Sequence, residues 1–224
     1  MMKNSAKQIA VVASLGLMMA GAAVAKSSWK IKATPLVVDP AATGSVVARW
    51  DSRAGLPDNI KSSKAKLPKK IKPGHALYLA KADAAATGAS ARVLIDGVQG
   101  ITLNEIGWDI RTDGSCSATS PRFEIVTQDN VIHTIGCDSA TVSVESPASG
   151  WERIRYDLAS ATPPIDSAAT DPATRTVQSI TIVLDGGQTT DTTTGQVTDP
   201  GFVYIDNIDI NNLWIQKPGT AQAK

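Results

Sequence analysis

The stretch that decides the fold is GFVYIDNIDI, residues 201–210. It is apolar and aromatic over its first half, as expected of a β-strand that belongs to a protein core. Asp206 and Asn207 then interrupt the run before Ile208 resumes it. A carboxylate inside a core strand is costly unless it is paired, hydrogen-bonded or bound to a metal. The stretch therefore predicts a core strand with a polar interruption that needs a structural reason.

Strand-like runs recur on both sides of this stretch, and no segment after the N-terminal region has a helical period. Clusters of Gly, Pro, Asp, Ser and Thr separate the runs and are typical of turns and loops. We expect an all-β chain, an antiparallel β-sandwich or jelly roll of about ten to eleven strands. The runs are residues 29–32, 35–38, 45–50, 75–82, 90–95, 105–111, 122–127, 131–136, 141–145, 151–158, 177–184 and 201–210.

Alternation within single runs supports a sandwich. Ile106, Trp108 and Ile110 share one face of a strand because successive side chains point to opposite faces. Trp108 and Trp151 stand where core residues are expected, and we predict that both are buried.

The N-terminus predicts export. Residues 1–25 read as a cleaved signal peptide, with Lys3 and Lys7 before an apolar run and Ala-Val-Ala at 23–25. The apolar run is short for a membrane span, although a retained anchor is the alternative. Residues 26–224 are then expected to form a single β-sandwich domain in the periplasm or outside the cell, with no membrane span after cleavage.

A basic Pro/Lys-rich loop is expected at 51–73. Its sharpest part, KSSKAKLPKKIK at 61–72, holds six lysines and no acid, with Lys69 and Lys70 at its centre. It is a candidate site for an anionic envelope polymer, and the alternative is a solvated loop. The absence of aromatic residues within it disfavours nucleic acid, whose single strands stack on aromatic platforms.

The two cysteines flank a predicted hairpin, 122–127 and 131–136. An exported chain meets oxidising conditions, so Cys116 and Cys137 are expected to form a disulfide. The alternative of a metal site lacks further soft ligands, because only His133 is near in sequence.

The order of these features resembles the galactose-binding-like jelly roll of many carbohydrate-binding modules. The similarity runs over about residues 75–215. It is carried by HALYLAKA at 75–82, GITLNEIGWDI at 100–110, GWERIRYDL at 150–158 and FVYIDNIDI at 202–210. The resemblance implies the fold, and it implies carbohydrate binding as an expectation, because one fold carries many functions.

The resemblance also implies a structural calcium ion held in part by Asp206. The family's second ligand comes from near the domain's N-terminus, where Asp51, Asp58 and Asn59 are candidates, although the family's Phe-Glu pattern is absent there. Calcium accepts carboxylate and carbonyl oxygens. The alternative is that Asp206 and Asn207 satisfy backbone groups at a β-bulge.

Ligand-binding residues are harder to assign. Trp50 and Trp214 lie near strand ends and are expected to be freer than Trp108 and Trp151, which makes them candidate sugar platforms. The chain lacks the common catalytic motifs. Glu105 and Glu124 are a candidate carboxylate pair if they share one sheet surface.

The sequence therefore predicts an exported, non-catalytic binding protein that recognises a glycan or another envelope or matrix component. The first alternative is a structural or assembly protein of the cell surface that acts through protein–protein contacts. The second alternative is a polysaccharide-active enzyme.

Overall fold

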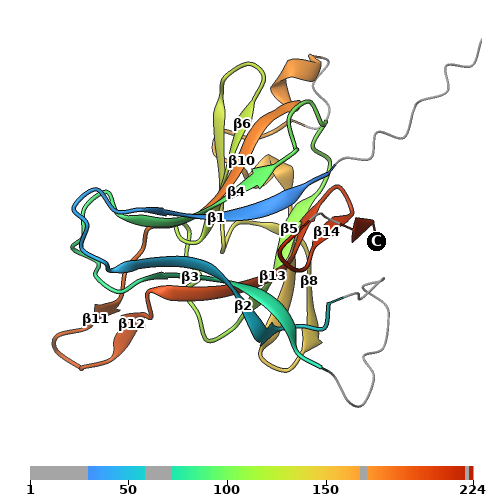
Figure 1. The fold of residues 1–224 in the computed structure, drawn as a ribbon. Coiled ribbons are helices and arrows are strands. Elements are labelled where there is room, and N and C mark those ends of the chain that lie inside the picture. Colours follow the sequence, from blue (N-terminus) through green and yellow to red (C-terminus); the bar gives the residue numbers. More distant parts are fainter. Residues whose placement is uncertain (1–29, 59–71, 167–170, 220–221, 224) are drawn as a thin grey trace, which may run out of the picture.

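The computed structural model describes residues 30–58, 72–166, 171–219 and 222–223. Two antiparallel sheets pack face to face, so the predicted all-β sandwich is confirmed, in an arrangement compatible with a jelly roll (Figure 1). The five-stranded sheet has, in spatial order, β1 (Lys32–Val38), β4 (Ser90–Asp96), β10 (Val177–Leu184), β6 (Arg122–Thr127) and β7 (Ile132–Gly136).

The eight-stranded sheet forms the other layer. In spatial order it has β15 (Gln222–Ala223), β14 (Leu213–Ile215), β13 (Phe202–Ile210), β5 (Ile106–Arg111), β9 (Trp151–Tyr156) and β8 (Thr141–Ala148). In the same sheet β3 (Gly74–Lys81) pairs with β13, and β2 (Val46–Gly55) pairs with β3. Three short pieces complete the fold: the pair β11 (Thr189–Thr190) and β12 (Val197–Asp199), and the 3-10 turns η1 (Leu158–Ser160) and η2 (Pro172–Thr174).

Most predicted strands are present, with differences at the ends. Of the predicted run 29–32, only Lys32 is in a strand: it begins β1, which contains the whole predicted run 35–38 and in which Pro35 pairs with Val93. Trp29 lies outside the described residues. Pro is tolerated there because β1 is an edge strand that needs no donor on its open side. The predicted loop at 51–73 begins later than expected, because β2 continues to Gly55.

The core lies between the sheets and follows the predicted alternation. Ile106, Trp108 and Ile110 are buried in it, which confirms these predictions. Trp151 is also buried, as predicted, but in a separate small cluster with Leu56 and Ala76. The Trp108 ring stacks on Phe123 of the opposite sheet with a centroid distance of 4.2 Å. This ring contact joins the two sheets at their centre.

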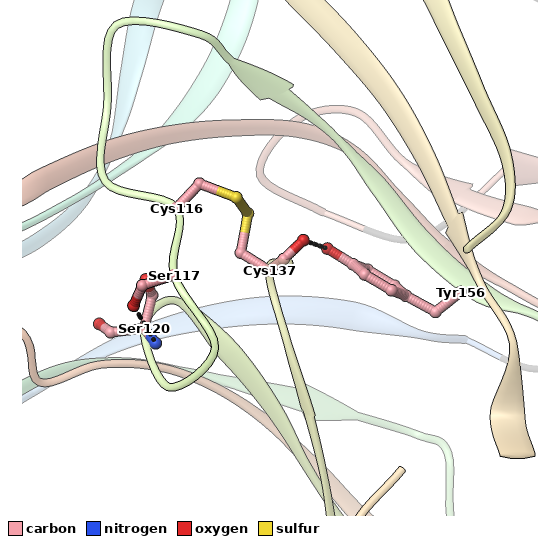
Figure 2. The surroundings of a disulfide bond; sticks show 5 residues. All are labelled: Cys116, Ser117, Ser120, Cys137 and Tyr156. Atoms are coloured by element: carbon pink, nitrogen blue, oxygen red, sulfur yellow. Dashed lines mark hydrogen bonds between the residues drawn. A yellow bond between two sulfur atoms is a disulfide. The ribbon is translucent and has the colours of Figure 1, made fainter. Parts of the chain in front are cut away.

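The disulfide between Cys116 and Cys137 is present, as predicted (Figure 2). It ties the segment before β6 to the end of β7, so it closes the predicted hairpin at its base. The hydroxyl of Tyr156 donates to the carbonyl oxygen of Cys137 at 3.1 Å, which links this hairpin to the other sheet. Beside the bond, the backbone N–H of Ser120 donates to the Ser117 hydroxyl.

Strand β13 changes partner in its middle. Phe202–Ile205 pair with β3, whereas Ile208–Ile210 pair with β14. Against β5 the register shifts between Asp206 and Asp209, and Asn207 has a φ of 44°. The polar interruption of the sequence is therefore a β-bulge at the point where β13 passes from one neighbour to the next.

Candidate functional site

A ladder of aromatic and arginine side chains crosses the outer face of the eight-stranded sheet, the face turned away from the core. Arg49, Tyr78, Tyr204 and Arg111 come from the adjacent strands β2, β3, β13 and β5. The two tyrosine ring centroids lie 4.8 Å apart. The Arg49 guanidinium lies over the Tyr78 ring, 4.6 Å from its centroid, and the Arg111 guanidinium lies over the Tyr204 ring, 3.8 Å from its centroid. We call these four residues the arginine–tyrosine ladder.

Strand alternation places the ladder on this face. Val203 and Ile205 point into the core and are buried, so Phe202 and Tyr204, which alternate with them, point outward. Phe202 lies 6.3 Å from both ladder tyrosines, ring centre to ring centre. Such cross-strand pairs stabilise a sheet whether or not a ligand binds.

The ladder combines aromatic surface with hydrogen-bonding groups. Arg49 donates to Asp51, and Arg111 donates to Asp113, through two nitrogens each. The three aromatic rings are half-buried, and burial raises the pKa of the Tyr78 hydroxyl above its ordinary value, with Tyr204 adding to the effect. The surface therefore presents ring edges, guanidinium groups, carboxylates and hydroxyl groups.

Beside the ladder, the same face holds a buried network of charges. Arg153 of β9 forms a bidentate ion pair with Asp109 of β5, and the amide of Asn207 also donates to Asp109. Gln216 donates in turn to the side chain of Asn207. The Trp214 ring lies over the Arg153 guanidinium at 4.7 Å. These residues are buried, so the network is shielded from solvent although it lies on the sheet face turned away from the main core.

A second ion pair continues the network. Arg155 lies 3.0 Å from Asp209 and 3.4 Å from Glu105. The indole N–H of Trp214 donates to the same Asp209 oxygen. A cavity of about 320 Å³ opens beside this pair, and its lining includes Arg155 and Ser143.

The contacts of Asp206 explain why a carboxylate interrupts this core strand. One carboxylate oxygen accepts the backbone N–H of Leu56, and the other accepts that of Asn207, at 2.7 and 2.6 Å. Burial raises the pKa of Asp206 well above its ordinary value, the negative charges of Asp109 and Asp58 add to the rise, and the two N–H groups oppose it. Asp206 and Asn207 thus satisfy backbone groups at a bulge, the alternative stated above.

The predicted calcium ligands do not converge as side chains. Asp58 bonds to the ring and backbone of His75, and Asp51 bonds to Arg49. Within residues 30–58, 72–166, 171–219 and 222–223, no group of three or more His, Cys, Asp or Glu side chains is placed to hold a metal. Asp206 is held by N–H donors on both oxygens, so the described side chains provide one candidate ligand and not a set. Asn59 lies outside the described residues.

One of the two candidate tryptophans differs from expectation. Trp214 is 1% exposed, so the prediction that it is freer than the core tryptophans is wrong, because β14 carries it onto the buried charge network. Trp50 is half-buried, packs against the main core and donates to the carbonyl oxygen of Ala33. Trp50 is thus freer than Trp108 and Trp151, as predicted, although its indole N–H is bound to β1.

Two other predicted sites have different outcomes. Lys69 and Lys70 of the basic loop lie outside the described residues. Glu105 precedes β5 of the eight-stranded sheet, whereas Glu124 is on β6 of the five-stranded sheet. They do not share a sheet surface, so the suggested carboxylate pair is wrong.

The sequence prediction missed the ladder although its pattern was present. Phe202 and Tyr204 alternate with core residues inside the stretch GFVYI, and Tyr78 lies between Leu77 and Leu79 in the same way. Aromatic residues at the outward positions next to core residues, on two strands, signal an aromatic outer face. Strand pairing alone brings Arg49 and Arg111 beside these rings.

Comparisons with known proteins add no identity: no family model, no curated protein and no solved structure matches this chain. The described part of the chain contains no helix long and apolar enough to cross a membrane.

Proposed function

We propose that this chain is an exported, non-catalytic binding protein whose arginine–tyrosine ladder contacts a glycan. The ladder is the observation that carries the proposal. Sugars offer apolar C–H faces beside hydroxyl groups, and the surface offers half-buried rings beside guanidinium and carboxylate groups. A ligand that is both hydroxyl-rich and partly apolar fits such a surface better than a purely apolar one.

The geometry also limits how a sugar would bind. The guanidinium groups of Arg49 and Arg111 each cover one face of a ladder tyrosine ring. The sugar would therefore lie across the ring edges and the Phe202 ring, with hydrogen bonds to the arginines. Such an arrangement suits a chain of sugar units spread over a sheet face.

Export is part of the same proposal. Residues 1–29 lie outside the described residues, so the signal peptide stays a sequence prediction. The disulfide supports it, because such bonds persist in oxidising compartments. Periplasmic and extracellular locations both agree with this.

A thermal-melt screen against a panel of neutral and acidic polysaccharides tests the proposal, since a ligand of the native state raises the melting temperature. We expect at least one glycan to do so. The double variant Arg49→Gln/Arg111→Gln should lose at least about tenfold in affinity for it, since both charged donors are lost. Lys32→Gln on the other sheet is the control for loss of one exposed positive charge away from the ladder. Equal affinity of the double variant and this control would exclude the ladder as the site.

One observation favours the alternative of an assembly protein. Strand β8 is the edge of the eight-stranded sheet, and it exposes Val142 at 74% and Val144 at 55%. An exposed apolar edge can pair with another chain, although two register shifts in β8 weaken such pairing. Light scattering across a range of concentrations tests this role. A mass increase that Val142→Lys/Val144→Lys abolishes would support it.

A further inference from the structure

Lys81 is a buried cation at a core position. It ends β3 after Leu77 and Leu79, which point between the sheets, and period-two alternation points Lys81 the same way. Its side chain is therefore enclosed at one end of the sandwich, and the residue is only 5% exposed. Lysine rarely occupies such a position unless it is paired.

Lys81 has no anionic partner among the described residues. Its Nζ donates to the backbone carbonyl oxygen of Asp185 at 2.9 Å, and no described carboxylate lies within ion-pair distance of it. The Asp185 carboxylate is instead bound by Arg122. An ammonium group has three N–H donors, so one neutral acceptor among the described residues leaves two of them available to a ligand.

A cavity of about 270 Å³ opens beside this ammonium group. Its lining comes from the end of β3, the loop before β4, the start of β4 and the residue after β10. The lining residues are Lys81, Gly88, Ala89, Ser90, Arg92 and Asp185. The volume lies just below the range of about 300–1,000 Å³ typical of drug-sized ligands, so a smaller molecule is expected.

The charges around the cavity define the ligand. Lys81 and Arg92 contribute two positive charges to the lining, and Asp185 contributes one negative charge. Two of these groups have partners outside the lining that cancel each other: Arg92 lies 3.8 Å from Glu124, and Arg122 binds Asp185. The lining thus has an excess of one positive charge, which a singly charged anion balances. A carboxylate matches this charge, and it accepts hydrogen bonds from an ammonium group through either oxygen.

We infer that this cavity, which we call the Lys81 pocket, binds a small carboxylate ligand with Lys81 as its counter-ion. The Lys81 pocket differs from the arginine–tyrosine ladder, which lies on the outer face of the eight-stranded sheet. Its ligand therefore binds whether or not the ladder binds a glycan.

D-Glucuronate and D-glucose are a matched pair of probes, because they share a ring and differ in the carboxylate. We expect calorimetry to show that glucuronate binds and glucose does not. Inorganic phosphate, which carries more charge at neutral pH, should bind more weakly than glucuronate. Equal binding of glucose, tighter binding of phosphate, or no binding of glucuronate would overturn the proposal.

Substitution locates the site. Lys81→Met keeps an unbranched apolar stem and removes the charge, so it should weaken glucuronate binding about tenfold or more. Lys32→Met on the exposed edge of β1 makes the same charge change and should have no effect. Unchanged affinity of the Lys81 variant would overturn the proposal.

Amide chemical shifts of the unaltered protein provide a readout if Lys81→Met does not fold. Glucuronate should shift Ala89, Ser90 and Asp185, which line the pocket. Shifts confined to Tyr78, Tyr204 and their neighbours would place the carboxylate on the ladder and overturn the Lys81 pocket.

Discussion

The guanidinium group of Arg153 donates two hydrogen bonds of 2.8 Å each to the carboxylate of Asp109. Only 4% of the Arg153 side chain and none of the Asp109 side chain is exposed. Taking two charges out of water is costly, and their mutual attraction offsets this cost only while both are present. The pair joins two neighbouring strands, β5 and β9, in register. Its energetic role should therefore appear when one partner is removed alone.

We predict that Asp109→Ala lowers the free energy of unfolding by about 3–5 kcal/mol, because it leaves the Arg153 charge buried without its partner. The double variant Asp109→Leu/Arg153→Met should lose less, since no unpaired charge remains at this position. Urea unfolding monitored by tryptophan fluorescence measures both. The exposed pair of Lys32 and Asp96 is the control, and Lys32→Ala should cost about 1 kcal/mol or less. A cost for Asp109→Ala no greater than for the control would contradict the prediction.

We predict that removal of the disulfide, by Cys116→Ser/Cys137→Ser, destabilises the fold by about 3 kcal/mol, given a sequence separation of 21 residues. For a chain of this size the melting temperature should fall by about 6–12 °C. Calorimetry checks this. A reducing agent should lower the melting temperature of the unaltered protein by a similar amount and leave the double variant unchanged. If both proteins respond alike to the reducing agent, the effect does not come from this bond.

Asp206 predicts a pH dependence with a definite sign. Burial raises its pKa in the folded state above the unfolded value near 3.8, so its stabilising contribution is fully present below that value. The contribution is lost as pH rises through the raised pKa. The melting temperature of the unaltered protein relative to Asp206→Asn should therefore fall as pH rises from 3 to 8 in calcium-free buffer, because Asn does not titrate.

The same comparison tests the predicted calcium ion. Calcium binds the ionised carboxylate, so added calcium should raise the melting temperature of the unaltered protein at neutral pH, and EDTA should reverse the rise. Asp206→Asn should respond much less. An identical melting temperature in calcium and in EDTA would exclude a structural calcium at Asp206, and the bulge would then be its whole role.

Strand positions were predictable because their causes are local. The alternation in residues 106–110 and the turn residues 128–130 act over a few neighbours, and both led to correct strands. The disulfide was predictable because the cysteines flank a single hairpin. Trp214 was misjudged because a position near a strand end does not reveal what the strand packs against.

By itself, then, the sequence determined a two-layer all-β fold, its main strands and its one disulfide, since period-two alternation and turn preferences depend on residues close together in the chain. Only the tertiary structure decided what the polar residues do. Asp206 is met by an N–H group 150 positions away, and Asn207 reaches Asp109 across 98 positions. The arginine–tyrosine ladder and the Lys81 pocket arise in the same way. Alternation shows which side of its own strand a residue faces, but only strand pairing and sheet packing decide which distant residues lie beside it.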